Sequence, residues 1–291
     1  MRRLSARMTL SRRRAYEGVA FVAPWLVGFL AFMAFPLAYS FYMSFTNVKV
    51  GPTSIELKWK GVGNYVYAFL SDNVFPVELM SFFQQSLLIV PIIVVFSLIV
   101  GLMLNSETWG RPLFRAVFFL PVIFSTSQVV LSLFNRGAGR IAFLDRFSVA
   151  EIVNTSLPDR WAGPVLAVLD RITLVLWYSG VQILLVLAAL KTINRTVYEA
   201  AAIDGAGRWE VFWKITLPAL TPFIVLNTVY TIVDLSTYPF NPILESIRRS
   251  MFDVRTGMGY AAAQGWTYFS IVLLVLAAVY AFGMRNVWRQ E

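Results

Sequence analysis

The stretch "EAAAIDGAGRWEVFWKITLPAL", residues 199–220, interrupts a chain that otherwise consists largely of long apolar runs. It carries five charged side chains and is divided by two glycines, Gly205 and Gly207. Charged side chains are costly inside a bilayer, so a stretch of this kind belongs outside it. The pattern therefore predicts a polar loop with a turn, which ends where a new membrane-spanning helix begins.

The composition of the whole chain is that of a membrane protein. Of its 291 residues 58% are hydrophobic and only 14% are charged, whereas about a quarter of the residues of a soluble domain are charged. Because an apolar helix of about 20 residues spans a bilayer, we expect an all-α, polytopic membrane protein. About six runs are long enough: 20–45, 83–104, 113–133, 164–190, 214–237 and 264–284. The first exceeds the apolar core of about 7–15 residues of a signal peptide, so we expect an uncleaved span.

Lysine and arginine are distributed unevenly between the connecting segments. One set carries about 12 in roughly 56 residues and the other about 10 in roughly 93. The first set is 1–18, 105–112, 191–213 and 285–291, and the second is 46–82, 134–163 and 238–263. Because short loops rich in Lys and Arg stay in the cytoplasm, we expect both termini to be cytoplasmic. The net charge of +9 then reflects these loops, and we expect no nucleic-acid partner.

The residue types limit the chemistry that the chain can perform. It has no cysteine and no histidine, which excludes disulfides, thiolate nucleophiles, Ser-His-Asp triads and most zinc sites. A phosphate loop of the form G-x-x-x-x-G-K-[ST] is also missing, since "LLVLAAL" precedes Lys191-Thr192. We expect no catalytic activity, no metal and no cofactor in this chain.

Local signals divide residues 191–222 into two helices. Thr196 and Glu199 fit a capping box, so we expect a helix to start there and to run through "EAAAID". Gly205 and Gly207 tolerate the left-handed backbone that the end of a helix requires. The following "RWEVFWKITLP" restarts a helix.

The second helix is suited to entering the membrane. Its aromatic residues Trp209, Phe212 and Trp213 suit the membrane interface. Pro218 and Pro222 lie near the start of the fifth span, where a missing amide donor costs least. On physical grounds alone, an amphipathic helix on the lipid surface explains the stretch equally well.

The run from Glu199 to Ala206, followed by Phe212 and by "ITLP" (215–218), resembles the EAA loop of binding-protein-dependent ABC importer permeases. Its spacing is similar to that of the carbohydrate, maltose-permease-type branch. Three further stretches resemble the larger, first-encoded permease subunit of that branch: "FPLAYSFYMSFTN" (35–47), "KGVGNYVYAFLSD" (60–72) and "GRPLFRAVFFLPVIFS" (110–125).

The resemblance implies a type I ABC importer permease fold, in which the EAA loop is a coupling helix seated in a groove of a separate ATPase. The coupling residues carried over are Tyr198, Glu199, Ala200, Ala201, Asp204, Gly205, Ala206, Ile215, Leu217 and Pro218. The implied partners are a second homologous permease, a dimeric ABC ATPase that binds ATP and Mg, an extracytoplasmic solute-binding protein and the lipid bilayer.

These features predict a division of the chain into a basic tail (1–18), the first helix with an outer segment (19–82), a transmembrane core (83–285) and a C-terminal tail (286–291). Within the core the EAA loop occupies about 194–218. In the outer segment, residues 59–73 suit a short interfacial helix.

Two stretches depart from the pattern of the family. Gln84-Gln85-Ser86 stands where an Asn-Thr or Asn-Ser pair often opens the second span. The stretch "STYPFNPILESIRRSMF" (236–252) stands where the sugar branch commonly shows Thr-x-Gly-Gly-Pro. The second departure lies on the outer side, so it leaves the substrate class open.

Polar side chains within the fourth and fifth spans are candidates for a substrate path. They fall at helical spacing and so share a face in each span. Hydrogen bonding that merely holds the helices together is the alternative for each, and for the two charged residues we expect an ion pair. The candidates are Arg171, Tyr178 and Gln182 in the fourth span and Asn227, Tyr230 and Asp234 in the fifth.

The leading hypothesis is therefore a permease subunit of an ABC importer for a sugar or oligosaccharide. An ABC importer for another solute, such as a glycerophosphate, is one alternative. A self-sufficient ion-coupled secondary transporter is another, although internal repeats of the kind typical of that class are not evident. An integral membrane enzyme would need catalytic groups that this chain lacks.

Overall fold

The computed structural model describes residues 10–50, 55–105, 113, 149–170, 172–238 and 241–287. Four described helices are long and apolar enough to cross a membrane: Tyr16–Ser44, Phe75–Asn105, Arg208–Ser236 and Gly257–Arg285. The pair Val175–Leu190 and Arg195–Ile203, bent by 65°, counts as a fifth candidate by the same measure. These helices confirm the all-α, polytopic prediction, while the predicted third span, apart from Leu113, lies outside the described residues.

The predicted fourth span differs from the structure in its first part. Residues 164–190 are divided between α9 (Asp159–Asp170) and α10 (Ile172–Leu190). Only α10 belongs to a helix pair that is apolar enough to span. The apolar run therefore predicted the membrane segment but placed its beginning too early, because "GPVLAVL" continues the apolar composition into a separate helix.

The chain folds as two compact units, each described here by itself. The first comprises Met1–Pro76 and Ser246–Thr267. It contains α1 (Leu10–Phe29), the π-helical turn η2 (Leu30–Ala34), α2 (Phe35–Ser44), the strands β1 (Thr46–Val50) and β2 (Ile55–Trp59), and α3 (Gly63–Leu70). It also takes in most of α14 (Pro242–Phe252) and the start of α15 (Gly257–Val287).

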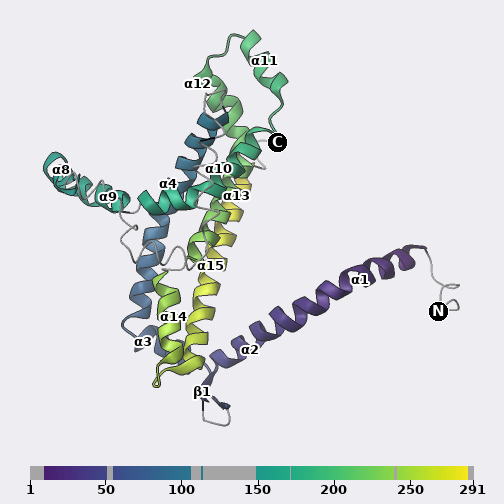
Figure 1. Ribbon diagram of the computed structural model, residues 1–291, viewed down its shortest axis with the longest axis vertical. Coiled ribbons are helices and arrows are strands. Elements are labelled where there is room, and N and C mark those ends of the chain that lie inside the picture. Colours follow the sequence, from purple (N-terminus) through teal and green to yellow (C-terminus); the bar gives the residue numbers. More distant parts are fainter. Residues whose placement is uncertain are drawn as a thin grey trace. The chain divides into compact units, whose positions relative to one another are not determined.

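The second unit comprises Val77–Glu245 and Tyr268–Glu291. It contains most of α4 (Phe75–Asn105), then α8 (Val149–Ser156), α9, α10 and α11 (Arg195–Ile203). It continues with α12 (Arg208–Val211), the π-helical turn η4 (Phe212–Thr216) and α13 (Leu217–Ser236), and it includes the remainder of α15 (Figure 1).

Two antiparallel strands in the first unit were not foreseen by the all-α prediction. β1 pairs with β2 in a register that places Thr46 opposite Trp59 and Val48 opposite Leu57. The alternation in "TNVKV" and "IELKW" is the period-2 signal of strands. Each run is only five residues long, so the longer helical runs around them dominated the prediction.

Asn64 connects the end of the first long helix to the segment after the hairpin. Its side chain is 3% exposed, and its Nδ2 donates to the carbonyls of both Ser44 and Thr46 at 2.9 Å. The Nζ of Lys60 donates to its Oδ1 at 3.0 Å. Asn64 lies in the first turn of α3, and this helix confirms the predicted short helix within 59–73. The buried side-chain amide of Asn64 thus holds together the segments that enter and leave the hairpin.

Asp72 determines where α4 begins. Its Oδ1 accepts from the amides of Val74 and Phe75, at 2.8 and 3.2 Å, and its Oδ2 accepts from the hydroxyl of Tyr260 in α15. Partial burial acts to raise the pKa of the Asp72 carboxyl, but these three hydrogen bonds outweigh it and hold the pKa below its ordinary value. The charged form therefore predominates and caps the helix N-terminus, where negative charge is favoured.

In the second unit, α4, α10 and α13 share a hydrophobic core. Ile89 and Ile93 of α4 pack with Val175 of α10 and Leu235 of α13. A small residue brings α4 close to α10, since a Cβ built on Gly101 would lie 2.6 Å from the Cγ1 of Val186. Small residues at such contacts are typical of helices that pack within membranes.

Candidate functional site

The helix α11, which contains the "EAAAI" run, begins earlier than predicted. Its N-cap is Asn194, whose side chain accepts from the amide of Thr196 at 3.1 Å. The predicted capping box of Thr196 and Glu199 is therefore wrong. Asn is at least as good an N-cap as Thr, and once it takes this position Thr196 lies inside the first turn. Glu199 instead pairs with Arg195, one turn before it, at 3.1 Å.

The helix α11 ends in a Schellman motif. The amide of Ala206 donates to the carbonyl of Ala201 at 2.9 Å, and the amide of Gly205 donates to that of Ala202 at 3.2 Å. This pair of bonds requires a left-handed residue at the position after the cap. Gly205 has φ +77° and Asp204 is the C-cap, so the predicted stop at Gly205 is confirmed.

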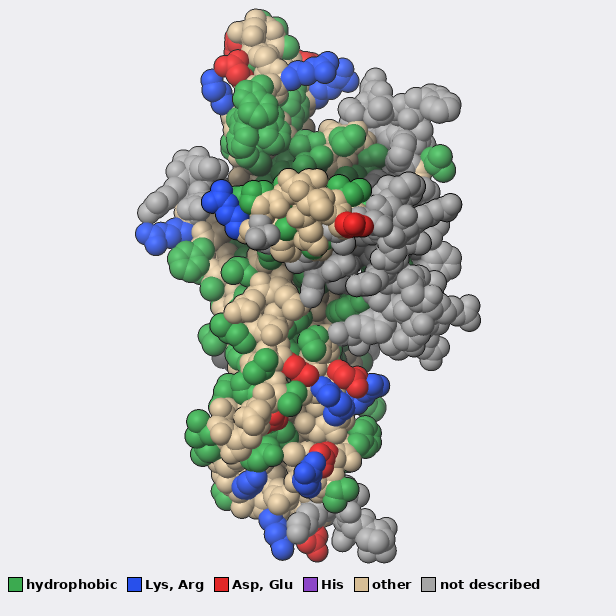
Figure 2. Space-filling model, turned by 90° about the vertical axis from the view of Figure 1, so that its left-hand side faces the viewer, with side chains coloured by type: hydrophobic (Ala, Val, Ile, Leu, Met, Phe, Trp, Pro, Cys, Tyr) green, Lys and Arg blue, Asp and Glu red, His purple; other side chains and the backbone are tan. Residues whose placement is uncertain are grey.

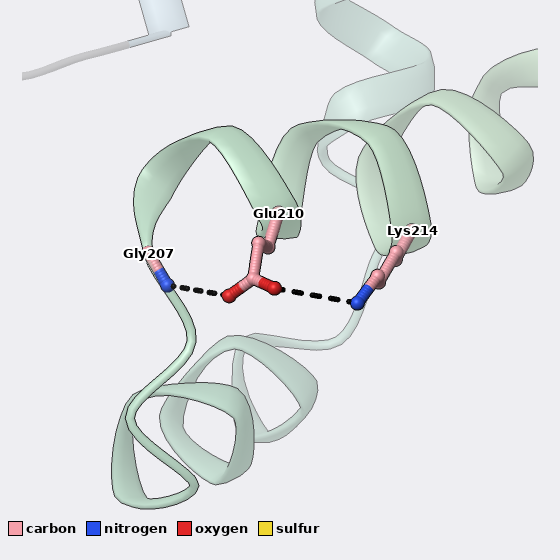
Figure 3. A network of polar contacts seen from close by, with 3 residues as sticks. All are labelled: Gly207, Glu210 and Lys214. Atoms are coloured by element: carbon pink, nitrogen blue, oxygen red, sulfur yellow. Dashed lines mark hydrogen bonds and ion pairs between the residues drawn. The ribbon is translucent and has the colours of Figure 1, made fainter.

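Gly207 plays a different part from Gly205. Its φ and ψ are −71° and 158°, which any residue adopts, so the prediction of a left-handed backbone is wrong at this position. Gly207 is instead the N-cap of α12. Its amide donates to Oε2 of Glu210 at 3.2 Å, while Oε1 of the same carboxylate accepts from Nζ of Lys214 at 3.3 Å (Figure 3).

The restarted helix runs without interruption into the fifth span. α12 passes through η4 into α13, where the amide of Leu217 reaches the carbonyl of Phe212 in a π-type bond. Pro218 follows at once and lacks an amide hydrogen for an α-helical bond. Both π-helical turns in the described chain end two residues before a proline, the other being η2 before Pro36. In each helix the wider π-helical turn makes room for the ring of the proline that follows it.

One side of α11 is buried and the other is exposed. Ala201 is 8% exposed and Tyr198 is half-buried, and the hydroxyl of Tyr198 lies 3.2 Å from Oγ1 of Thr216. On the opposite side Ile203 is 87% exposed, whereas Val197, which lies nearer to the buried side, is 43% exposed. Glu199, Ala200, Asp204 and Gly205 are also exposed, and Ala206, Ile215, Leu217 and Pro218 are half-buried.

The elements after α11 also expose aromatic side chains, Trp209 in α12 and Trp213 in η4. Trp209 and Trp213 have ring centroids 5.6 Å apart, and their side chains are 73% and 49% exposed. Figure 2 shows acidic and basic side chains together at the end of the unit formed by α11 and α12, next to hydrophobic ones. Where exposed apolar side chains form a contiguous patch rimmed by polar ones, the patch marks a surface that binds another protein or a membrane.

The polar candidates in the fourth and fifth spans divide into two groups. Gln182 and Asn227 are 0% and 1% exposed, and Nδ2 of Asn227 donates to the carbonyl of Gln182 at 3.4 Å. This contact joins α10 to α13 and favours the alternative of hydrogen bonding between helices for this pair. Tyr230 is 38% exposed, while Tyr178 and Asp234 are half-buried.

The partly exposed group includes a residue that sequence reasoning missed. Tyr238, just beyond the end of α13, stacks edge-on against Tyr178 with ring centroids 5.5 Å apart. Asp234 lies close enough to Tyr178 and Tyr230 to act on them electrostatically. The spacing of Asp234 and Tyr238, four residues apart, is the signal that would have found it. Arg171 lies outside the described residues, so its ion pair with Asp234 stays a prediction.

Buried polar atoms near this group lack partners within the described part of the chain. They are Nε2 and Oε1 of Gln182 and Oδ1 of Asn227. The Gln182 side chain lies beside Asp234, but without a hydrogen bond of acceptable geometry. Because an unsatisfied buried polar group costs about 1–3 kcal/mol, this region of the α10–α13 interface is suited to a polar ligand, to water or to another subunit.

Comparisons with known proteins place these features in context. No family model matches the chain. It is 30% identical over 280 residues to the probable ABC transporter permease protein YesP of Bacillus subtilis, covering 91% of this chain and 89% of that protein. It is 32% identical over 236 residues to the lactose transport system permease protein LacF of Rhizobium radiobacter, covering 77% and 74%.

A solved structure has the same fold. It is a chain of a bacterial alginate ABC transporter, crystallised with a periplasmic protein that binds an alginate pentasaccharide. The TM-score is 0.64, and the alignment covers 94% of this chain and 96% of that chain. The sequences are only 19% identical.

Proposed function

Because the chain belongs to the ABC transporter permease family, we propose that it is a transmembrane subunit of an importer that forms, with a second permease, the path for a sugar or oligosaccharide. An extracytoplasmic solute-binding protein delivers the solute, and a dimeric ATPase that binds ATP and Mg drives the transport. The sugar class is supported by the name of the relative LacF and by the tyrosines around Asp234, since aromatic faces and hydroxyls suit sugars.

The observation that carries this proposal is the geometry of α11. It is a separate short helix, ended by a Schellman turn and joined through α12 to the fifth span. Its exposed side bears Ile203, in line with Glu199 and Arg195. This arrangement fits a coupling helix that docks in a groove of an ATPase and favours it over a helix lying flat on lipid, because the Arg195–Glu199 ion pair is also exposed. Membership of the ABC transporter permease family also argues against a self-sufficient secondary transporter.

The isolated chain is expected to hydrolyse no ATP and to copurify with a separate ATPase, because its sequence holds no phosphate loop. Phosphate release by the purified polypeptide and by the intact complex measures this. Robust hydrolysis by the polypeptide alone would contradict the proposed division of labour.

The substrate class is tested with the whole complex in vesicles, supplied with the binding protein and with ATP inside. Radiolabelled lactose, other oligosaccharides and a glycerophosphate are offered in parallel. Uptake of a sugar that needs both ATP and the binding protein supports the proposal. Uptake of the glycerophosphate alone would move the substrate to another class, and uptake without ATP would contradict the transporter class.

We also propose that both termini and α11 face the cytoplasm, and two exposed positions test this. Because the chain has no cysteine, Asn154→Cys and Gly207→Cys each introduce a single thiol at a position that the structure exposes. We expect Cys at 154 to react with an impermeant maleimide in whole cells and Cys at 207 to react only after permeabilisation. The reverse pattern would overturn the orientation derived from charge.

A further inference from the structure

The hydroxyl of Thr216 differs from those that follow it along the same continuous helix. The later hydroxyls each donate to the carbonyl four residues earlier, at 2.7 to 3.1 Å; they belong to Thr221, Thr228, Thr231, Ser236 and Thr237. Such bonds stay within one helix. Oγ1 of Thr216 lies instead 3.2 Å from the hydroxyl of Tyr198 in α11.

The local structure explains why Thr216 is available for this contact. It is the last residue of η4, where the α-helical pattern is interrupted and the amide of Leu217 reaches Phe212. Thr216 is also 5% exposed and Tyr198 is half-buried, so their contact is partly shielded from water. Tyr198 and the buried Ala201 lie three residues apart and so on the same side of α11.

The chain that connects α11 to α12 is short and sharply bent, and it is called the elbow below. Between the end of α11 at Ile203 and the start of α12 at Arg208 the chain makes the Gly205 turn. A helix attached only through such an elbow can pivot about it. A second attachment, five residues before the end of α11, makes the helix and the start of the fifth span move together.

We propose that the hydrogen bond between Tyr198 and Thr216 transmits ATP-driven movement of α11 to the fifth span. This inference rests on the proposed function, in which α11 docks on the ATPase. In this proposal Tyr198 and Thr216 are positioning residues, which act by holding α11 to η4.

The test uses the whole complex in vesicles and needs no known substrate. Val233→Cys places one thiol in the fifth span, at a side chain that is 43% exposed. The maleimide labelling rate of this chain is measured with and without ATP and vanadate. In an otherwise unchanged chain we expect ATP and vanadate to change the rate. With Tyr198→Phe or Thr216→Val we expect this change to fall about fivefold, as loss of a net hydrogen bond of ~1 kcal/mol implies, while ATP hydrolysis persists.

Matched variants separate transmission from general damage. Thr216→Ser keeps the hydroxyl and should respond as the parent does. Thr221→Val removes a hydroxyl that bonds only within its own helix and should also respond normally. The double variant of Tyr198→Phe and Thr216→Val should be no worse than either single one, because both remove the same bond.

Three outcomes overturn the inference. The first is a normal response in both single variants, and the second is an equal loss with Thr221→Val. The third is a response to ATP and vanadate that falls only in proportion to the amount of assembled complex, because this would show that the contact serves assembly alone. A parent chain that never responds to ATP and vanadate would instead overturn the proposed coupling to an ATPase.

Discussion

Replacing Gly259 with alanine is expected to remove most of the folded complex from the membrane. A Cβ at this position of α15 would lie 2.0 Å from the carbonyl oxygen of Thr46 and 3.2 Å from that of Met43. Both are backbone atoms, which cannot rotate away as a side chain can. The oxygen of Thr46 is also held by Nδ2 of Asn64 at 2.9 Å, so the strand cannot retreat without breaking that bond.

We expect the loss in the free energy of unfolding to lie at the upper end of the range observed for overpacked sites. Extra methyl groups in packed interiors typically cost about 1–3 kcal/mol, and the upper value of about 3 kcal/mol corresponds to a fall of roughly 6–12 °C in Tm. Thermal unfolding of the purified complex and its yield from the membrane both measure this effect.

The same helix offers a matched control for this substitution. Gly265 has nothing within 4 Å of a built Cβ, so Gly265→Ala adds the same methyl group without a clash. Alanine is also the better helix former, by about 0.5–1 kcal/mol. We expect Gly265→Ala to match or slightly exceed the parent in Tm. If the two variants behave alike, the close approach of α15 to Thr46 is wrong.

The contrast between these glycines shows what the sequence could and could not predict. The membrane helices could be predicted from composition, because a run of about 20 apolar residues is long enough to span a bilayer as a helix. Nothing local distinguishes Gly259 from Gly265, since both lie in one apolar helix. Their difference comes from a strand that is distant in sequence. The same holds for Asn64, whose partners Ser44 and Thr46 lie 20 and 18 residues earlier in the chain.

Helix ends were predictable only at positions whose backbone conformation suits few types of residue. The stop at Gly205 needs a left-handed residue, which favours glycine strongly, and it was predicted. The start of α11 was missed because Asn194 and Thr196 can both cap a helix, and only the structure shows which one does. The start of α4 at Phe75 was placed too late because Asp72, not the apolar run, decides it.

The candidate substrate path was predicted as a set of residues but not as an arrangement. Helical spacing placed Asn227, Tyr230 and Asp234 on one face. The structure buries Asn227 against α10, while Tyr230 remains partly exposed. Spacing along one helix fixes which residues share a face, whereas the neighbouring helix determines which of them remain accessible.

Gly205→Val is expected to reduce ATP-dependent uptake by about tenfold or more while the chain still inserts and assembles. The φ of +77° at this position costs an ordinary L-residue about 1–2 kcal/mol, and a β-branched residue more. A Cβ at Gly205 meets no atom within 4 Å, so the effect comes from the backbone alone. The Schellman bonds from Ala206 and Gly205 would be lost, and α11 would populate its docking geometry less often. Uptake depends on that populated fraction.

Two variants test whether the turn itself is responsible. Gly207→Val places the same side chain two residues later, where φ is −71° and ψ is 158° and a built Cβ again meets nothing within 4 Å. Because extended backbone suits valine, the backbone strain expected at 205 is absent here. We expect only the small loss of uptake that follows from valine being a poorer N-cap for α12 than glycine. Gly205→Asn tolerates the left-handed region and should retain most uptake. Uptake and ATP hydrolysis are measured at equal amounts of complex. Equal losses at 205 and 207 would point to crowding of the docking surface rather than to the turn, and normal uptake with Gly205→Val would contradict the role of the Schellman end in holding α11 for coupling.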